Sequence, residues 1–290
     1  ATYVPELPEV ETTKAGIIPI ALQQTISSIV IRAPKLRWPI PQNIAKILPG
    51  QTVRSIERRA KYLLLNFDIG TMIIHLGMSG RLGALNTALP AQKHDHVDIC
   101  FTHGGILRYT DPRRFGCILW TTNPALEHEL LRDLGPEPFS KMFNGKYLWQ
   151  QAQNKKTPVK TFIMDAKIVV GVGNIYASES LFSAKIDPRT PAQQVTLEKY
   201  HELAQHIKQI LKLAIAKGGT TLKDFFNAAG KPGYFSQKLQ VYGRADQPCL
   251  ICLTPIVALQ LGQRNTFFCP QCQGANIHAI NWNHMSNKGV

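Results

Sequence analysis

The chain has 290 residues, 44% of them hydrophobic and 18% charged, so it is long enough for two or three small domains and its composition excludes global disorder. Lysine and arginine number 33 against 19 acidic residues, and the net charge of +14 favours a polyanionic partner such as nucleic acid. No stretch approaches the roughly 18 apolar residues of a membrane span, and the opening residues lack a signal peptide's hydrophobic run, so we expect a cytoplasmic protein without structural disulfides.

The first half of the chain is expected to be mainly β structure after an opening helix. Glu6 to Leu22 forms the predicted helix, with Pro8 in its first turn. Between Thr25 and Trp120, the alternation of Val97, Ile99 and Phe101 with polar residues predicts a half-buried strand. Further short apolar segments bounded by turn residues predict strands at Tyr62–Leu65, Met72–Leu76 and Gly116–Trp120.

The second half is expected to be helical up to the cysteines. A linker is predicted at residues 134–138, and the clearest helix runs from Thr196, as N-cap, to Lys217, with Gly218 and Gly219 as its stop. A second linker is predicted at residues 230–234, and the polar tail after Gly274 is expected to be loose.

Four of the six cysteines have the spacing of a zinc site. Cys249-x-x-Cys252 and Cys269-x-x-Cys272 are separated by sixteen residues, which is enough for a β-hairpin between the two pairs. Such a site fills all four zinc positions with thiolate, so the predicted cofactor is one structural zinc ion. Cys100 and Cys117 lie in strand-like segments and are expected to be core residues.

Several polar or exposed-looking segments carry two interpretations. The loop Gly171–Tyr176 opens a helix and suits phosphate binding, with Asn174 as a donor, although many glycine loops bind nothing. In the turn Asp111–Gly116, Phe115 could wedge between base pairs beside Arg113, or could be buried in the sheet. The same choice between a functional role and a core or solvated position holds for Met78, Lys61, Lys155, Lys156, Lys160 and Arg264.

Taken together, the motifs resemble the formamidopyrimidine-DNA glycosylase family of bacterial oxidised-purine glycosylases. The likeness runs from Pro5 to about Gln273 and rests on seven motifs in order. They are Pro5–Glu11, His75–Gly80, Lys93–Asp98, Asp111–Gly116, Gly171–Tyr176, Thr220–Phe225 and the cysteine hairpin.

The resemblance implies a multidomain α+β fold. It consists of an N-terminal β-sandwich flanked by helices (5–133), a helix–two-turn–helix domain (134–232), a zinc β-hairpin (240–274) and a loose tail (275–290). It also implies a monomer that acts on damaged double-stranded DNA, away from membranes, in the cytoplasm and associated with the nucleoid. The activity implied is base-excision repair, in which a DNA glycosylase and AP lyase removes 8-oxoguanine and formamidopyrimidines and cuts the strand by β,δ-elimination.

The same resemblance assigns roles to residues. Pro5 would be the nucleophile and Glu6 the general acid/base, with Lys61 and Arg264 assisting catalysis. Residues 220–225 would form part of a loop over the flipped base. The residues expected to bind DNA are Met78, His94, Arg113, Phe115, Lys160, Asn174, Tyr176 and Lys223.

Pro5 departs from the family pattern because Ala1 to Val4 precede it. An internal proline nitrogen is an amide and cannot form a Schiff base. We expect that Val4 is a GUG start codon read as valine, so that removal of the initiator methionine would expose Pro5. The alternative is a DNA-binding relative with little activity.

Two other functions remain open. One is the endonuclease VIII-like branch of the superfamily, which acts on oxidised pyrimidines. The other is a zinc-ribbon transcription accessory protein, which would explain the cysteines but neither Pro5 and Glu6 nor the Arg113–Phe115 turn.

Overall fold

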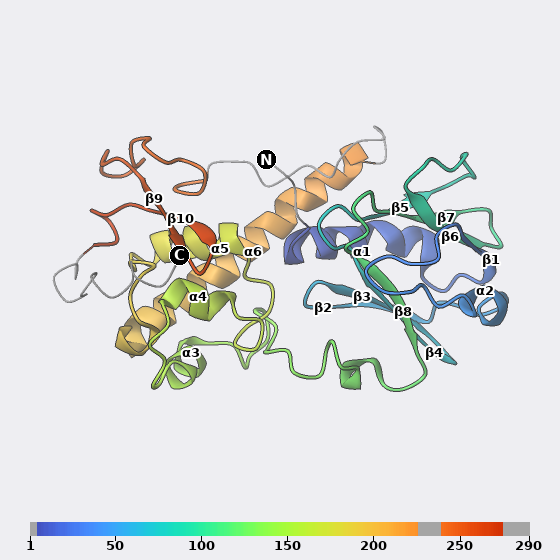
Figure 1. The fold of residues 1–290 in the computed structure, drawn as a ribbon, viewed down its shortest axis with the longest axis horizontal. Coiled ribbons are helices and arrows are strands. Elements are labelled where there is room, and N and C mark those ends of the chain that lie inside the picture. Colours follow the sequence, from blue (N-terminus) through green and yellow to red (C-terminus); the bar gives the residue numbers. More distant parts are fainter. Residues whose placement is uncertain (1–4, 226–238, 275–290) are drawn as a thin grey trace. The chain divides into compact units, whose positions relative to one another are not determined.

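The computed structural model describes residues 5–225 and 239–274, with side chains in the last helix described up to Gly218. The described chain separates into two compact units, which divide between Leu134 and Gly135 and again between Leu211 and Lys212 (Figure 1). None of the described helices is long and apolar enough to cross a membrane.

Unit 1 opens with the helix α1 (Leu7–Ala21). Glu6 precedes its first turn with extended backbone, and Pro8 lies in that turn, where no backbone N–H is needed. The Glu6 backbone N–H donates to Glu9 Oε2 at 2.8 Å, the reciprocal half of a capping box. The predicted helix and the position of its proline are therefore confirmed.

Two four-stranded antiparallel sheets enclose the core of unit 1, which confirms the predicted sandwich. The first has the order β2-β3-β4-β8 and the second the order β1-β6-β7-β5. Their inward side chains, such as Leu63 and Ile74 of the first and Ile99 and Leu107 of the second, belong to one buried cluster. The strands are β1 (Ile26–Ile31), β2 (Ser55–Arg59), β3 (Tyr62–Phe67), β4 (Gly70–His75), β5 (Arg81–Leu85), β6 (Asp95–Phe101), β7 (Ile106–Thr110) and β8 (Cys117–Thr121).

The sequence of β3 is apolar without alternation because both faces of this strand are covered. Leu63 and Leu65 face the main core, whereas Leu64 joins Ile73 and Leu131 in a second cluster on the other face of the sheet. A strand covered on both faces reads as a continuous apolar run. Unit 1 also contains the one-turn helix α2 (Ile44–Ile47) and the 3-10 turn η1 (Ala125–Glu127).

The prediction that β6 is half-buried was wrong. His96 and Asp98, on the face expected to meet solvent, are 2% and 3% exposed. Their polar atoms are satisfied inside the protein, because His96 Nε2 bonds to the carbonyl of Asp111 and Asp98 bonds to arginines. Alternation in the sequence reported polarity correctly, but a polar side chain can be buried when its hydrogen bonds are made there.

Unit 2 is helical, and its longest element is α6 (Leu197–Phe225), which continues into unit 1. Thr196 Oγ1 accepts a hydrogen bond from the Lys199 backbone at 3.2 Å, which confirms Thr196 as the N-cap. The core face of α6 contains Tyr200, Leu203 and Ile207, all at most 1% exposed. The other elements are α3 (Gly145–Gln151), α4 (Val159–Met164), α5 (Asn174–Ser183) and the 3-10 turn η2 (Ala192–Gln194).

The predicted helix stop at Gly218 and Gly219 was wrong, because α6 passes through both glycines. A Cβ atom at Gly218 would collide with Thr12 Oγ1 of α1 in the same unit. Gly218 therefore allows close packing of α6 against α1, although glycine within a helix costs about 1 kcal/mol relative to alanine. The expectation that residues 220–225 form a loop was also wrong, since they continue the same helix.

The cysteine region of unit 2 is a two-stranded hairpin of β9 (Val257–Leu261) and β10 (Arg264–Phe268). Gly262 and Gln263 connect the strands with positive φ angles of 54° and 64°, as a two-residue hairpin turn of type I′ requires. The predicted linker at residues 230–234 and the tail at 275–290 lie outside the described residues.

Candidate nucleic-acid interface

Met78 lies on a tight loop that follows β4. The backbone N–H of Gly77 donates to His75 Nδ1 at 2.9 Å, and Gly77 has a φ angle of 61°, which favours glycine. Burial and the nearby charges of Lys61 and Arg37 lower the pKa of His75 to about 4, so its ring is neutral at pH 7 and can accept this bond. The loop holds Met78 with 38% of its surface exposed.

The turn between β7 and β8 presents an exposed aromatic residue and an arginine. Phe115 is 44% exposed, and the guanidinium of Arg113 lies over its ring at 4.8 Å from the centroid. The interpretation in which Phe115 is buried in the sheet was therefore wrong. A Cβ atom at Gly77 would lie 2.5 Å from the Phe115 carbonyl carbon, so the Met78 loop and this turn touch through their backbones.

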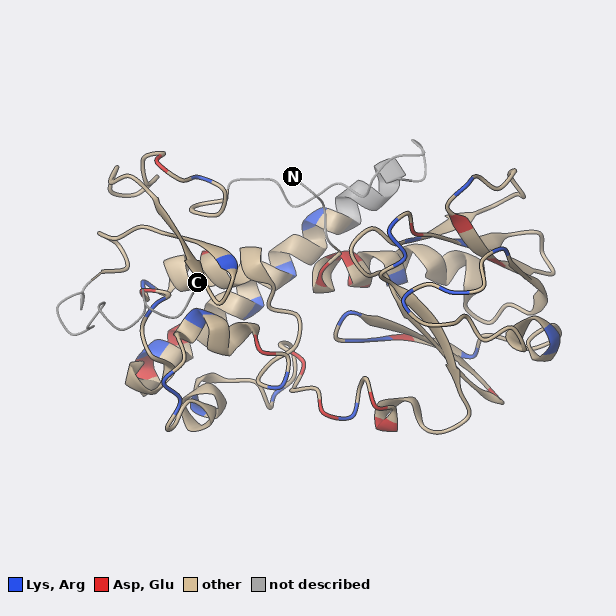
Figure 2. Ribbon diagram, in the orientation of Figure 1, with Lys and Arg blue, Asp and Glu red and all other residues tan. Residues whose placement is uncertain are grey.

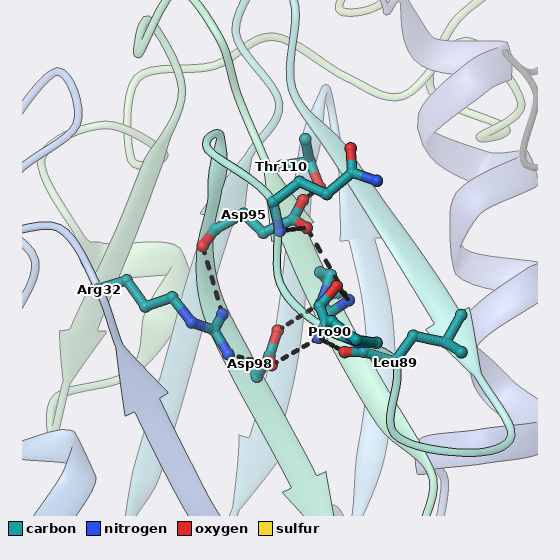
Figure 3. A network of polar contacts seen from close by, with 8 residues as sticks. Arg32, Leu89, Pro90, Asp95, Asp98 and Thr110 are labelled. Carbon is teal, nitrogen blue, oxygen red and sulfur yellow. Dashed lines mark hydrogen bonds and ion pairs between the residues drawn. The ribbon is translucent and has the colours of Figure 1, made fainter.

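His94 is half-buried at the end of a segment anchored by a buried arginine. Arg108 binds Asp98 with two hydrogen bonds, Nε to Oδ1 at 2.9 Å and Nη2 to Oδ2 at 3.0 Å. Its guanidinium also donates to the carbonyls of Leu89 and Pro90, at 2.6 and 3.3 Å (Figure 3). Arg108 thereby fastens the start of the segment that carries His94 to the sheet.

A second arginine completes this network. Arg32 Nη2 donates to Asp98 Oδ2 at 2.6 Å, and its Nη1 donates to the carbonyl of Asp95 at 3.3 Å (Figure 3). Burial raises the pKa of Asp98, but the hydrogen bonds from Arg108 and Arg32 outweigh it and leave the pKa below its usual value. Asp95 Oδ2 accepts the Gln92 backbone N–H at 2.8 Å, which fixes the chain two residues before His94.

The three predicted catalytic residues of unit 1 lie in adjoining segments. Lys61 is half-buried in the two-residue turn between β2 and β3. Arg58 Nε, on β2, donates to Glu11 Oε2 at 2.6 Å and so ties this hairpin to α1. Pro5, which is buried, and Glu6 lie at the start of α1, a segment where acidic residues are concentrated in an otherwise basic chain (Figure 2).

In unit 2, two predicted DNA contacts bind the hairpin. Asn174, the first residue of α5, donates from Nδ2 to the carbonyl of Asn265 at 2.9 Å. Lys160 is only 1% exposed, and its Nζ donates to Thr266 Oγ1 at 2.8 Å and lies 3.5 Å from the Asn265 carbonyl. Lys160 is thus neither a solvated lysine nor fully open to a ligand.

A basic pocket borders these contacts. It has a volume of about 420 Å³, and its lining includes Lys155, Lys160 and Arg264. Burial, with the charge of Arg264 as a second cause, lowers the pKa of Lys160 to about 8. Arg264 itself is exposed at the start of β10, directly after the turn. The pocket has the charge and size for an anionic group such as a phosphate.

The four cysteines converge as the spacing predicts. Cys249 Sγ lies 3.9 Å from Cys272 Sγ, Cys252 Sγ lies 3.4 Å from Cys269 Sγ, and the four sulfur atoms lie within 4.8 Å of one another. A tetrahedral zinc ion with Zn–S bonds of about 2.3 Å needs sulfur atoms separated by about 3.8 Å. The four cysteines therefore fit one structural zinc ion, which supports the hairpin.

Two residues predicted to bind DNA are not seen on the described surface. Tyr176 is 2% exposed, in the first turn of α5, so its side chain is buried and does not form a surface that could bind DNA. The side chain of Lys223 lies outside the described part of α6. Sequence reasoning overlooked Thr266, which is fully buried and binds Lys160; its small polar side chain gives no signal in a strand pattern.

Comparison with known proteins covers nearly the whole chain. Three protein-family models match the chain. Residues 4–118 match the formamidopyrimidine-DNA glycosylase N-terminal domain, residues 134–226 match the formamidopyrimidine-DNA glycosylase H2TH domain, and residues 246–274 match the zinc finger found in FPG and IleRS. Relatives named formamidopyrimidine-DNA glycosylase from Vibrio cholerae and Marinobacter nauticus are 56% and 52% identical over 270 residues, which is 93% of this chain and 100% of each relative.

Solved structures are similar over the same extent. A complex of Lactococcus lactis Fpg with DNA containing an abasic site has a TM-score of 0.83 and 33% identity, covering 93% of this chain and 99% of that one. A complex of MutM with DNA containing carbocyclic 8-oxo-G has a TM-score of 0.82 and 33% identity, with the same coverage.

Proposed function

Because the chain belongs to the formamidopyrimidine-DNA glycosylase family, we propose that it is a base-excision repair enzyme. It removes oxidised purines from duplex DNA and cuts the strand at the resulting abasic site. The observation that carries this proposal is the exposed pair Arg113 and Phe115 beside Met78. An exposed aromatic wedge and an arginine suit an enzyme that must fill the space left by an extruded nucleotide.

The chemistry begins with a free amine at Pro5, in a chain that starts there. The α-amino nitrogen has an ordinary pKa of about 7.7–8.0, against about 10.4 for lysine, so far more of it than of a lysine amine is neutral and nucleophilic near neutral pH. The amine attacks C1′ of the flipped nucleotide and the base leaves with the electrons of the C1′–N bond. Glu6 directly follows Pro5 and precedes the first turn of α1, so its carboxylate is close enough in the chain to move the protons that opening of the sugar ring requires.

The covalent intermediate then allows strand cutting. Loss of the O4′ bond gives an iminium between the amine and C1′, which acidifies the neighbouring C2′–H. Removal of that proton expels the 3′ phosphate, and a second elimination expels the 5′ phosphate. Lys61, in the turn tied to α1 through Arg58 and Glu11, supplies positive charge to the lesion strand.

The remaining contacts bind the DNA backbone. His94 and Arg264 are proposed to contact phosphates directly, and Lys160 and Asn174 to hold β10 so that Arg264 is presented. Tyr176 is buried, and Lys223 contributes a further charge to DNA binding. The parts at 5–133, 134–232 and 240–274, followed by the tail 275–290, act as one monomer on damaged DNA in the cytoplasm, associated with the nucleoid.

Oxidised pyrimidines are a second candidate substrate. One of the similar structures is a complex of Lactococcus lactis Fpg with DNA containing an oxidised pyrimidine, at 34% identity and a TM-score of 0.82. Single-turnover excision from duplexes with 8-oxoguanine and with thymine glycol compares the two substrates. Faster excision of 8-oxoguanine supports the oxidised-purine assignment, and faster excision of thymine glycol contradicts it.

Borohydride trapping on 8-oxoguanine DNA tests the mechanism. Two forms are compared, the 290-residue chain and a chain that begins at Pro5. The shorter form is expected to become covalently attached to the lesion strand, whereas the longer form, whose Pro5 nitrogen is an amide, is not. A Pro5-initiated chain that binds the lesion duplex but never becomes attached would leave only a DNA-binding function.

A further inference from the structure

A buried carboxylate joins the three loops that carry the proposed DNA contacts of unit 1. Asp111 is 0% exposed, although it belongs to the turn that presents Arg113 and Phe115. We infer that Asp111 and Ser79 are positioning residues that hold the Met78 loop and the Arg113–Phe115 turn as one rigid wedge for filling the vacated base stack. The inference deepens the proposed function and rests on it.

The carboxylate of Asp111 accepts hydrogen bonds from both loops. Oδ1 accepts the Ser79 hydroxyl at 2.7 Å and the Arg114 backbone N–H at 3.1 Å. Oδ2 accepts the Gly116 backbone N–H at 2.9 Å and the Tyr109 hydroxyl at 3.1 Å. Three donors, with the proton of the Tyr109 hydroxyl shared with the His75 carbonyl at 2.9 Å, compensate the cost of burying the charge of this carboxylate, because bonds to an ionised acceptor are stronger than neutral ones.

Ser79 connects Met78 to the turn a second time. Its hydroxyl donates to Asp111 and also accepts the backbone N–H of Arg113 at 3.0 Å. Ser79 directly follows Met78, so one hydroxyl links the neighbour of one inserting side chain to the backbone of another. The donor proton and one acceptor lone pair of this hydroxyl are thus used within the wedge.

The backbone of Asp111 extends the connection to the third loop. Its N–H donates to the carbonyl of His94 at 3.1 Å, and its carbonyl bonds to His96 Nε2 at 2.9 Å. The phosphate contact proposed for His94 and the wedge therefore share one anchor. Movement of the wedge would pull on the segment that carries His94.

The hydrogen bonds also hold backbone geometry that the turn would not adopt without support. Arg114 has a φ angle of 58°, a left-handed conformation that is unfavourable for a non-glycine residue. Its N–H bonds to Asp111 on the carboxylate and also lies 3.3 Å from the Asp111 carbonyl. Strained backbone that is over-determined by its surroundings is typical of functional sites, where it pre-organises a side chain.

A pre-organised wedge matters at one step of the reaction. Arg113, Phe115 and Met78 must enter the stack together while the damaged nucleotide leaves it. If the loops were not joined, their ordering would be an added entropic cost of that step. Extrusion is less costly at an abasic site, which has no base to unstack, so loosening the wedge should affect excision of an intact lesion more than cutting of a pre-formed abasic site.

The test removes one hydroxyl and then restores it. Ser79→Ala, in the Pro5-initiated chain, is expected to lower the ratio of 8-oxoguanine excision to abasic-site cutting by about fivefold under single-turnover conditions, the size of one lost hydrogen bond. Ser79→Thr, which keeps a hydroxyl, should recover at least half of the loss. The fluorescence of 2-aminopurine beside the lesion should rise more slowly in Ser79→Ala, because insertion is delayed.

Ser27→Ala is the matched control, since the Ser27 hydroxyl donates to the Cys100 carbonyl at 3.1 Å in β1, away from the wedge. It should leave the ratio unchanged. A ratio and 2-aminopurine kinetics in Ser79→Ala equal to those of the unaltered chain would overturn the inference while leaving the proposed function standing. A Pro5-initiated chain without substitutions that neither excises the lesion nor is trapped on it would overturn both.

Discussion

Lys160 illustrates how a residue proposed to serve DNA binding can do so at the expense of stability. Its ammonium group is buried beside Thr266 and close to the positive charge of Arg264. No described ion pair includes it, so the cost of desolvating its charge is offset only by hydrogen bonds. A cation held in this way is suited to receive an anion in the adjoining pocket.

Lys160→Met should therefore stabilise the free protein while weakening its binding to a lesion duplex. Thr266 Oγ1 lies 3.3 Å from the Arg264 carbonyl, and the Asn265 carbonyl still accepts from Asn174, so methionine would leave neither group without a partner. The Tm of the variant is expected to exceed that of the unaltered protein by about 2–4 °C at pH 7. Scanning calorimetry and fluorescence anisotropy measure the two effects, and a lower Tm at pH 7 would contradict the expectation.

The pH dependence of this difference follows from the lowered pKa of Lys160. Between pH 8 and 10.5 the unfolded chain binds a proton that the folded chain has lost, so the free energy of unfolding of the unaltered protein rises with pH in this window. Below pH 8 both states are protonated and the full cost of burying the charge is present. The Tm advantage of Lys160→Met should therefore shrink as the pH rises from 8 towards 10.5.

At the level of elements, the proposed DNA interface is built from turns whose backbone only particular residues tolerate. Gly77 combines a positive φ angle with direct backbone contact to the turn at Phe115 and Gly116. Any side chain at this position meets backbone atoms, which cannot move aside as the end of a flexible side chain could. The approach of the two loops thus depends on one missing Cβ atom.

Gly77→Ala should destabilise unit 1 by about 2 kcal/mol or more, since it adds left-handed strain and a backbone collision. Gly83→Ala in β5 is the matched control, because no atom lies within 4 Å of its added Cβ and its change should stay below about 1 kcal/mol. Urea unfolding of both variants provides the comparison. Equal stability losses would mean that the contact between the loops is not tightly packed.

For the whole molecule, we expect DNA binding to depend on the bound zinc ion. The hairpin carries Arg264 and is held to the helices of unit 2 by Lys160 and Asn174. Binding of the metal supplies folding energy to small sites of this kind. Removal of zinc should therefore disorder the hairpin and abolish lesion binding, whereas unit 1, which has its own core, should stay folded.

Metal analysis is expected to find one zinc ion per chain. Cys252→Ser should lose that zinc and the DNA affinity, and Cys100→Ser, at a half-buried position on β6, should keep both. Thermal melting followed by circular dichroism should show the unfolding transition of the β-sandwich of unit 1 in each variant. Full DNA affinity in a zinc-free protein would refute this link.

The sequence by itself determined the features that depend on neighbouring residues. Local patterns of capping, apolar runs and cysteine spacing indicate the start of α1 directly after Glu6, the N-cap at Thr196, the strands around Leu63 and Ile74, and the zinc hairpin. Even Arg113 and Phe115 could be selected as candidates, because a turn with these residues is unusual.

Only the tertiary structure decided which polar groups are buried and what they bind. Lys160 meets Thr266 and Asp111 meets Ser79 across 106 and 32 positions of the chain. The burial of His96 on β6 and the passage of α6 through Gly218 likewise depend on Asp111 and Thr12, which are distant in sequence. A periodic pattern reports only the polarity of adjacent residues, whereas burial and hydrogen-bond partners are set by packing between segments that the fold brings together.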